Sequence, residues 1–319
     1  MGRPEVSVVI PTYRREARLT FALDALAEQT IAPDRFEVLV VRAAGEMPAT
    51  DEPPDGLAVT FLEAPAAGAA AQRNVGWLRA RAPLVAFTDD DCRPAPGWLA
   101  GLLAAAGDGV VVQGRTEPDP NEAHLLTGLA RSMEVAGPHP AYPSCNIAYP
   151  CELLERLGGF DDAFGAPWGE DTDLALRALE AGARAAYADD AVVWHAVLAR
   201  SLPAAMREAG RRQWLPLVIA RHPAQRAALY GDLFVNRAHA ALAGGLAVAA
   251  VARRRPTLAL ASALAPHAFA HLWVGLSGAE MSPHGGARLA LAWPERLAVD
   301  LAEVAATVRG AVRHRAPVA

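Results

Sequence analysis

Short apolar stretches rich in β-branched residues alternate with helical stretches through the first half of the chain, and this alternation constrains the fold most. Residues 6–11 (VSVVIP) and 36–41 (FEVLVV) have the composition of buried strands. Between them, Leu19, Leu23 and Leu26 recur at spacings of four and three, which places them on one face of a helix. Strand, helix and strand in this order predict a parallel sheet with right-handed crossovers.

The same alternation continues to about residue 195. The further predicted strands are 58–63, 84–88, 109–117 and the extended stretch 183–195, and the further predicted helices are 69–82 and 170–182. Residues 138–150 (PHPAYPSCNIAYP) are rich in proline and read as an irregular connection. We therefore predict an α/β domain over residues 1–200.

The chain changes character after residue 200, where Ala, Leu and Arg dominate and no strand pattern remains. Helices are predicted at 203–222, 237–252, 257–276 and 296–314. Residues 1–200 hold 16 arginines and 29 acidic residues, a balance of −13, whereas the remainder holds 14 arginines and 6 acidic residues, a balance of +8. We predict a second, helical region over residues 201–319 that meets different partners from the first.

Several classes of protein are excluded by what the sequence lacks. No lysine occurs, which rules out a P-loop phosphate clamp, a Schiff-base lysine and an aspartate-nucleophile phosphatase. No GxGxxG follows the first strand, so a dinucleotide fold is excluded. The three cysteines have no metal-site pattern and read as reduced thiols, and residues 1–16 do not resemble a secretory signal, so we expect a cytoplasmic protein.

Three consecutive aspartates, Asp89, Asp90 and Asp91, follow the predicted strand 84–88. Side chains two apart on an extended strand point the same way, so we expect Asp89 and Asp91 to converge while Asp90 faces elsewhere. Converging carboxylates at the carboxyl edge of a parallel sheet suit Mg²⁺ or Mn²⁺ held partly by substrate phosphates. The alternative is an acidic turn in which Asp90 or Asp91 caps a helix starting near Trp98.

The order of motifs over residues 6–195 resembles family 2 glycosyltransferases, which have the GT-A fold. The matching stretches are VSVVIPTYRRE, FEVLVV, AAGAAAQRNVG, VAFTDDDC, NIAYPCELLERLGGFDDAF, WGEDTDLALRALEAG and VVWH. The resemblance implies a mostly parallel sheet flanked by helices, here with a C-terminal helical appendage. It also implies transfer of a sugar from a nucleotide sugar with inversion at the anomeric carbon.

In this resemblance the aspartates are the DxD motif, which holds a divalent cation (Mn²⁺ or Mg²⁺) on the donor diphosphate. Asp89 and Asp91 would form the metal site, with Asp91 as the direct ligand and Asp89 nearer the ribose and the waters around the ion. Asp89 and Asp90 would also contact the donor. His195, 24 residues after Asp171, would be a further ligand. The alternative for His195 is a hydrogen-bonded core histidine at the end of a strand.

The resemblance places the catalytic base on Asp171, with Glu170 as the second candidate and more often an acceptor contact. An inverting displacement needs such a base to take the proton of the acceptor hydroxyl, and a neighbouring carboxylate can raise its pKa towards neutrality. Trp168, Gly169 and Asn146 are predicted to contact the acceptor. The alternative is that the acidic pair merely favours a helix N-terminus.

Donor contacts are implied for the loop after the first strand and for the QRNVG stretch. The residues are Pro11, Thr12 and Tyr13 for the base and ribose, and Arg73 and Asn74 for the nucleotide or diphosphate. A surface salt bridge is the alternative for Arg73. The family usually carries Asp after the second strand where this chain has Arg42, so a nucleoside contact is altered and UDP-, GDP- and dTDP-sugars all stay open as donors.

The acceptor class is not readable, and a glycan end, a lipid-linked glycan and a small metabolite all remain candidates. A catalytically inactive sugar-nucleotide-binding or scaffolding protein is the alternative function. No nucleic-acid partner is expected. For the basic second region we predict association with an anionic membrane surface at its cytoplasmic face rather than a span, because the apolar run at 237–252 is short and Pro266 interrupts the next. A soluble helical subdomain or a homodimer interface is the alternative.

Overall fold

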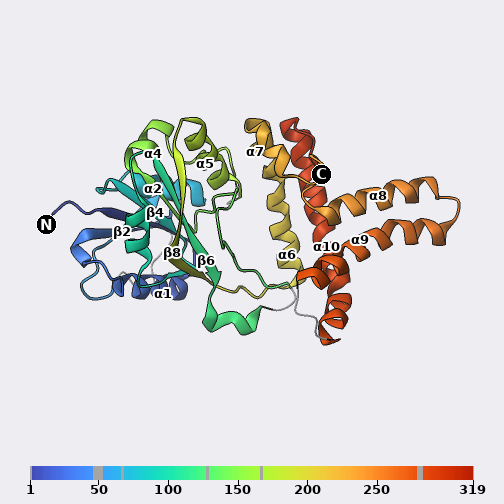
Figure 1. Cartoon of the computed structure of the whole chain (residues 1–319), viewed down its shortest axis with the longest axis horizontal. Helices are drawn as coiled ribbons and strands as arrows, with labels where there is room; N and C mark the ends of the chain where they lie inside the picture. Colours follow the sequence, from blue (N-terminus) through green and yellow to red (C-terminus); the bar gives the residue numbers. More distant parts are fainter. Residues whose placement is uncertain are drawn as a thin grey trace. The chain divides into compact units, whose positions relative to one another are not determined.

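A computed structural model describes residues 2–45, 53–65, 68–126, 129–165, 168–278 and 283–318; for residues 263, 271–278 and 283–291 it describes the backbone only. The chain forms two compact units, Met1–Ala199 and Arg200–Ala319 (Figure 1). Each unit is described by itself below.

The first unit is built on one eight-stranded sheet with the strand order β3-β2-β1-β4-β7-β6-β8-β5. Its strands are β1 (Val6–Thr12), β2 (Phe36–Ala43), β3 (Val59–Ala64), β4 (Leu84–Thr88), β5 (Cys92–Pro94), β6 (Val110–Pro118), β7 (Asn146–Pro150) and β8 (Arg184–His195). Strands β3, β2, β1 and β4 are mutually parallel, and Val6 of β1 lies between Phe36 and Leu84. The predicted mostly parallel α/β sheet is confirmed.

Two short strands lie in stretches that the sequence pattern did not assign to strands. Strand β7 runs antiparallel to both β4 and β6, and β5 runs antiparallel to the end of β8. Strand β7 was not predicted because it has only five residues and lies in the proline-rich stretch 138–150. It is a strand because it pairs with β4 and β6. The sheet is therefore mixed rather than purely parallel.

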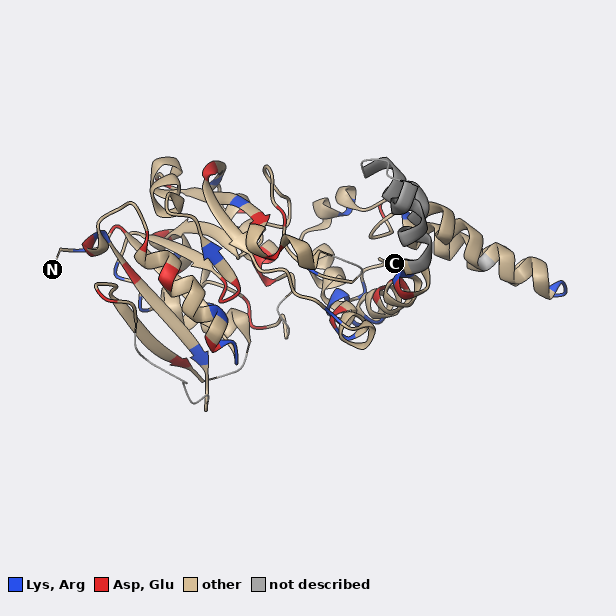
Figure 2. Ribbon diagram, turned by 90° about the horizontal axis from the view of Figure 1, so that it is seen from below, with Lys and Arg blue, Asp and Glu red and all other residues tan. Residues whose placement is uncertain are grey.

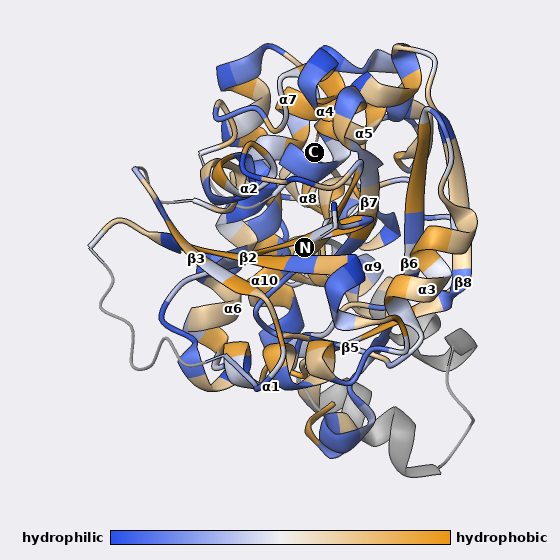
Figure 3. Cartoon of the chain, turned by 90° about the vertical axis from the view of Figure 1, so that its left-hand side faces the viewer, coloured by the Kyte–Doolittle hydropathy of each residue, from blue (hydrophilic) through white to orange (hydrophobic). Residues whose placement is uncertain are grey.

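Helices cover both faces of the sheet and enclose two apolar layers. These helices are α1 (Glu16–Ala27), α2 (Ala69–Trp77), α3 (Trp98–Ala105), α4 (Cys151–Leu157) and α5 (Glu170–Glu180), with short 3₁₀ turns η1 (Pro33–Arg35) and η2 (Pro120–Leu125). Helices α1 and α3 pack on the face that carries Val8 and Ile10, whereas α2, α4 and α5 pack on the face that carries Val9. Figure 3 shows the hydrophobic strands lying between these helices. Burial on both faces explains why the central strands read as continuous apolar runs.

The regular elements of the second unit that the structure describes are helices, apart from an isolated bridge between Tyr230 and Phe234, and the predicted helical appendage is confirmed. Its elements are α6 (Leu202–Ala209), η3 (Gly210–Trp214), α7 (Leu215–Arg221), η4 (Pro223–Ala228), α8 (Arg237–Val251), α9 (Pro256–Gly278) and α10 (Pro283–His314). The single helix predicted at 203–222 is instead broken by η3, just before Pro216, which has no backbone N–H to donate. No helix among the described residues combines the length and apolarity that crossing a membrane requires.

Substituting Gly114 with Ala is expected to lower the free energy of unfolding by about 1–3 kcal/mol, through overpacking. Gly114 lies at a register shift in β6, and a Cβ there would stand 2.5 Å from the carbonyl oxygen of Ala191 and also against the side chain of Asn146. The Asn146 amide would then have to give up hydrogen bonds inside the sheet. Urea unfolding followed by circular dichroism measures the effect.

Gly97→Ala is the matched control for this substitution. Gly97 has a negative φ of −88°, and an added Cβ there would meet nothing within 4 Å. We expect its unfolding midpoint to stay near that of the parent protein. Equal effects of the two substitutions would contradict the close approach of β6 and β8 at Gly114.

Candidate active site

Polar side chains from several elements meet where β1 and β4 end and where α5 begins. The aspartates follow β4, Thr12 ends β1, and Glu170 opens α5. Parallel strands β1 and β4 deliver their carboxyl ends to the same edge of the sheet, which is where open α/β sheets bind ligands. The order of the strands in the sheet therefore brings Thr12 and the aspartates together.

The expectation that Asp89 and Asp91 converge while Asp90 faces elsewhere is wrong. Strand β4 ends at Thr88, and the N–H of Cys92 donates to the carbonyl of Asp89, so the aspartates lie in a turn. Strand alternation does not apply within a turn, and Asp90 and Asp91 point toward a shared partner while Asp89 turns to another. Neither Asp90 nor Asp91 caps α3, whose N-cap is Gly97.

Asp90 is held by the end of β1. The hydroxyl of Thr12 donates to Asp90 Oδ2 at 2.8 Å, and the backbone N–H of Tyr13 donates to the same oxygen at 3.3 Å. Burial raises the pKa of Asp90 to about 6, and the charge of Arg15 opposes that rise. The predicted donor residue Thr12 thus acts here by positioning Asp90.

Arg15 is a site residue that the sequence reasoning missed. Its guanidinium donates to Asp90 Oδ1 at 3.1 Å and to Asp91 Oδ2 at 2.6 Å, so one cation bridges both carboxylates. The side chain is 44% exposed, which leaves it able to swing towards a ligand. The adjoining Arg14 has a left-handed φ of 53°. Only the fold could reveal the pairing, because 75 residues separate Arg15 from Asp90.

Asp91 and His195 offer a fitting set of ligand atoms for a divalent cation. One ligand atom each from Asp91, Cys92 and His195 lies within 4.8 Å of the other two, and all three residues are buried. His195 Nδ1 lies 2.8 Å from the carbonyl oxygen of Ala196, so it carries the proton and leaves the Nε2 lone pair facing Asp91 Oδ1 at 3.8 Å. A carboxylate oxygen and an imidazole nitrogen are suitable ligands for Mn²⁺.

Cys92 is the least suitable of the three groups for Mn²⁺, because a thiolate is a soft ligand and Mn²⁺ prefers oxygen and nitrogen. Burial and the neighbouring Cys145 raise the pKa of the Cys92 thiol well above its ordinary value. Asp89, predicted as a ligand, lies apart from this group and pairs with an arginine instead.

Arg73 joins the aspartate turn to the start of α5. Its guanidinium donates to Asp89 Oδ1 at 2.6 Å and to Glu170 Oε1 at 3.2 Å, and it lies 5.6 Å from the centre of the Phe160 ring. Arg73 is only 4% exposed, so the surface salt bridge considered for it is excluded. Because both carboxylates depend on one buried cation, Arg73 holds β4 and α5 in a single site.

Asp171 lies beside Glu170 in the first turn of α5 and faces the connection that leads into β7. Its Oδ2 accepts from the N–H of Ser144 at 3.3 Å, and its Oδ1 accepts from the N–H of Thr172 at 2.8 Å. Burial raises the pKa of Asp171, and the charge of Arg73 opposes that rise. Gly169, with a left-handed φ of 93°, turns the chain just before the helix and so aims these carboxylates at the site.

Glu170→Gln is expected to reduce the fall in the free energy of unfolding as pH rises from about 4.5 to 7. Burial and the charge of Asp171 raise the pKa of Glu170 from an ordinary 4.5 to about 7, against the influence of Arg73. The folded protein therefore keeps a proton that the unfolded chain releases, so this contribution favours folding at low pH and is lost as pH rises through that window. Removing the group should reduce the slope by up to about 1.4 kcal/mol per pH unit.

Denaturant unfolding at half-unit pH steps measures that slope. Glu152→Gln is the matched control, because Glu152 is an exposed carboxylate in the first turn of α4. An unchanged slope in Glu170→Gln would show that Glu170 is ionised throughout the window.

Two of the predicted contact residues are committed to internal hydrogen bonds. Asn146 is 1% exposed; its amide donates to the carbonyls of Arg115 and Ala191 and accepts from Trp98 Nε1, so its predicted acceptor role is withdrawn. Asn74 donates to the Phe160 carbonyl and accepts from the Phe160 N–H and from Trp77. Asn74 thus fastens the 159–160 turn to α2, and its predicted contact with the nucleotide is withdrawn.

The remaining predicted residues lie around the same edge. Pro11 is buried within β1, Tyr13 is half-exposed beyond its end, and Trp168 is partly buried directly before Gly169. Gln72, which sequence reasoning also missed, donates to the carbonyls at the ends of β1 and β2. These two hydrogen bonds hold the ends of both strands against α2.

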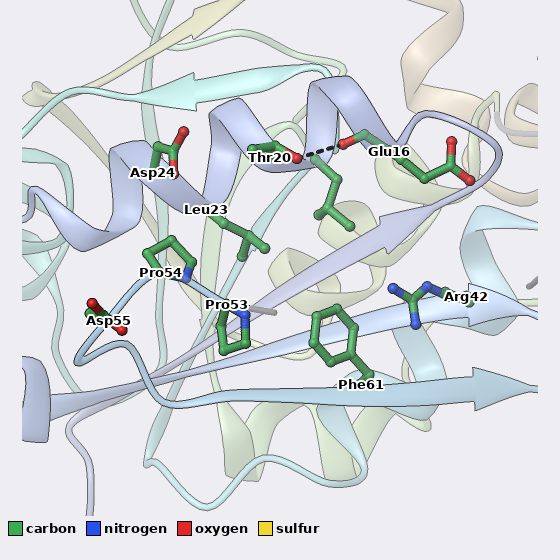
Figure 4. A pocket seen from close by; sticks show the side chains of 10 residues that line it. Glu16, Thr20, Leu23, Asp24, Arg42, Pro53, Pro54, Asp55 and Phe61 are labelled. Atoms are coloured by element: carbon green, nitrogen blue, oxygen red, sulfur yellow. Dashed lines mark hydrogen bonds between the residues drawn. The ribbon is translucent and has the colours of Figure 1, made fainter. Parts of the chain in front are cut away.

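Arg42 lines a separate pocket of about 330 Å³ between α1 and strands β2 and β3 (Figure 4). Its guanidinium lies 4.4 Å from the centre of the Phe61 ring, and Glu16 of α1 lines the same pocket. Arginine over an aromatic face is a favourable cation–π arrangement. Arg42, at the position where the family usually carries Asp, therefore gives this pocket a positive side chain in place of a negative one.

Residues 7–154 match the sequence model of glycosyl transferase family 2. A curated relative, validoxylamine A glucosyltransferase of Streptomyces hygroscopicus subsp. limoneus, is 33% identical over 177 residues, which cover 54% of this chain. The matched region spans 35% of that relative's length.

Two solved structures resemble this fold. The mannosyltransferase PcManGT from Pyrobaculum calidifontis, in complex with GDP-Man and Mn²⁺, is 25% identical with a TM-score of 0.58 over 99% of this chain and 88% of that one. S. aureus TarS 1-349, in complex with UDP-GlcNAc, is 16% identical with a TM-score of 0.50 over 98% of this chain and 92% of that one. The first unit thus has the GT-A type of fold that the sequence resemblance implied.

Proposed function

We propose that this protein is a metal-dependent, inverting glycosyltransferase that moves a sugar from a nucleotide-diphosphate sugar to a hydroxyl acceptor. The observation that carries the proposal is that buried Arg73 joins Asp89 of the aspartate turn to Glu170, beside Asp171, in a region that matches the family 2 model. The matched relatives bear the names of active transferases, which disfavours an inactive binding or scaffolding protein.

Asp91 and His195 would hold the divalent cation in this proposal. When bound, the ion would stabilise the negative charge that develops on the departing diphosphate. Arg15, already 2.6 Å from Asp91, would add positive charge on the same side, and its half-exposed side chain can turn to the phosphates. Mn²⁺ is the first ion to test, because the similar mannosyltransferase structure contains it.

Asp171 would act as the base. Its carboxylate would take the proton of the acceptor hydroxyl while that oxygen bonds to the anomeric carbon and the bond to the phosphate oxygen breaks on the opposite face. The hydrogen bonds from Ser144 and Thr172 fix the carboxylate for this task. Glu170, buried and paired with Arg73, would support the geometry rather than accept the proton.

Thermal unfolding with Mn²⁺ and a panel of UDP-, GDP- and dTDP-sugars tests donor binding, since a bound ligand raises the apparent stability. GDP-mannose and UDP-GlcNAc come first, because the two similar structures hold these donors. Release of nucleoside diphosphate then tests catalysis. The proposal fails if no nucleotide sugar raises the melting temperature and none is cleaved.

We further infer that the second unit associates with the anionic, cytoplasmic face of a membrane. Helices α8 and α9 expose several large apolar side chains, namely Leu246, Val248, Val251, Leu258, Leu260 and Phe269. Three exposed arginines at residues 253–255 connect the two helices, and Figure 2 shows them as basic residues at the tip of this hairpin. Apolar side chains beside clustered arginines suit binding in the interfacial region of an anionic bilayer.

Replacing the three arginines at 253–255 with Gln is expected to weaken binding to phosphatidylserine-containing vesicles by about 100-fold, from about 1 kcal/mol per arginine. Sedimentation with vesicles at low salt measures the loss. The matched control replaces three other exposed arginines of the same unit, Arg207, Arg309 and Arg315. Full-length protein that stays unbound at low salt would contradict membrane association.

A further inference from the structure

A cluster of polar side chains, none of them used above, is buried among the helices of the second unit. His239 comes from α8, His267 from α9, and Asp300 and Glu303 from α10. His239, His267 and Asp300 are each at most 1% exposed. Burying such groups is costly unless each finds a partner, so their arrangement calls for a physical cause.

His267 is fully engaged and fixes one carboxylate. The indole N–H of Trp293 donates to His267 Nδ1 at 3.1 Å, which leaves the ring proton on Nε2. That Nε2–H donates to Asp300 Oδ2 at 2.9 Å. The Asp300 carboxylate is thereby held in one orientation, with its second oxygen, Oδ1, directed elsewhere.

The remaining atoms of the cluster lack hydrogen bonds among the described residues. Both ring nitrogens of His239, Glu303 Oε2 and Asp300 Oδ1 are buried without a hydrogen-bond partner. His239 Nε2 lies 3.4 Å from Glu303 Oε2 without making a hydrogen bond of normal geometry. One ligand atom from each of His239, Asp300 and Glu303 lies within 4.8 Å of the other two.

Two arginines supply positive charge at the rim of the cluster. Arg296 approaches Asp300 Oδ1 at 2.9 Å, and Arg212 approaches Glu303 Oε2 at 3.6 Å. Burial opposes ionisation of both carboxyls, but His267 and Arg296 lower the pKa of Asp300, and His239 and Arg212 lower that of Glu303. Both arginine side chains are at least one-third exposed, so each can move to solvent if another cation takes its place.

We propose that His239, Asp300 and Glu303 form a binding site for a transition-metal dication of the Zn²⁺ class, which links α8 to α10. Tetrahedral zinc with bonds of about 2.0–2.1 Å places neighbouring ligand atoms about 3.3 Å apart, close to the separation of His239 Nε2 and Glu303 Oε2. Asp300 and Glu303 are three residues apart on α10, so both face α8. His267 orients the ligating carboxylate, as groups around metal ligands commonly do.

The test uses full-length protein carrying Asp91→Asn, which disables the proposed active-site metal position, after treatment with a chelator. Zn²⁺ or Co²⁺ alone is added, and the metal retained through gel filtration is counted. We expect one equivalent per chain and, with Co²⁺, the visible absorption of a four-coordinate ion. In this background His239→Gln and the isosteric Glu303→Gln should both lose the equivalent and the absorption, while His314→Gln, elsewhere on α10, should keep them.

Retention of the equivalent by both cluster variants would overturn the proposal, and so would failure of the Asp91→Asn parent to retain any metal. Circular dichroism reports whether each variant folds. If neither cluster variant folds, the parent protein decides: an unshifted melting temperature with Zn²⁺, or no Co²⁺ absorption, rejects the site. Because the readout is bound metal, these results are independent of whether the protein transfers a sugar.

Discussion

Asp171→Asn is expected to lower the rate of sugar transfer by about 10³-fold or more while leaving donor binding close to that of the parent protein. Asn has nearly the same shape, and its single carbonyl oxygen can keep one of the two hydrogen bonds from the N–H groups of Ser144 and Thr172. It cannot accept the proton of the acceptor hydroxyl, so the loss falls on the chemical step. Turnover at saturating substrates measures it, and donor titration followed by protein fluorescence checks binding.

Two further variants sharpen the assignment of the base. Asp190→Asn removes an exposed carboxylate in the irregular middle part of β8 and should leave turnover unchanged. Glu170→Gln should affect activity less than Asp171→Asn, because Glu170 is turned to Arg73. Normal turnover in Asp171→Asn, or a larger loss in Glu170→Gln, would move the base away from Asp171.

Asp91→Asn is expected to abolish the part of donor binding that depends on Mn²⁺. An amide oxygen is a weaker ligand than a carboxylate for a hard dication, and Asp91 is the carboxylate that faces His195 Nε2. The parent protein should bind its nucleotide sugar more tightly with Mn²⁺ than with a chelator, whereas the variant should bind equally weakly in both. Calorimetric titration with and without the ion measures the difference.

Cys92→Ser provides a control from the same cluster. The Cys92 thiol is buried, and sulfur is a soft ligand that suits Mn²⁺ poorly, so its replacement should preserve the response to Mn²⁺. Should Asp91→Asn still bind the donor more tightly with Mn²⁺, the ion would have to be held by other groups, with Asp89 and Asp90 the next to replace.

The sequence by itself determined the central strands of the sheet and the helical second region. Strand residues such as Val8 and Val9 are buried on opposite faces, so the apolar runs had to be read as central strands. Because β1 and β4 are parallel neighbours, Thr12 and the aspartates reach one edge. The strands and helices themselves follow from local patterns, which each segment carries regardless of distant contacts, whereas the pairing of β1 with β4 belongs to the fold.

Tertiary structure alone decided which side chains face one another. The turn after Thr88 set Asp90 and Asp91 on Arg15, and the packing around Gly114 drew Asn146 into the sheet. The position of β7 between β4 and β6 was also decided by tertiary structure, because so short a segment becomes a strand only by pairing with those two neighbours.

The cluster in the second unit makes the same point over a longer span. His239 and Glu303 are 64 residues apart in sequence, on α8 and α10, and nothing in either helical pattern pairs them. Helical periodicity shows which residues share a face of one helix. It does not show which face of a second helix packs against that face. Side-chain partners are often far apart in sequence. They come together through the packing of the whole unit, which no single stretch of residues determines.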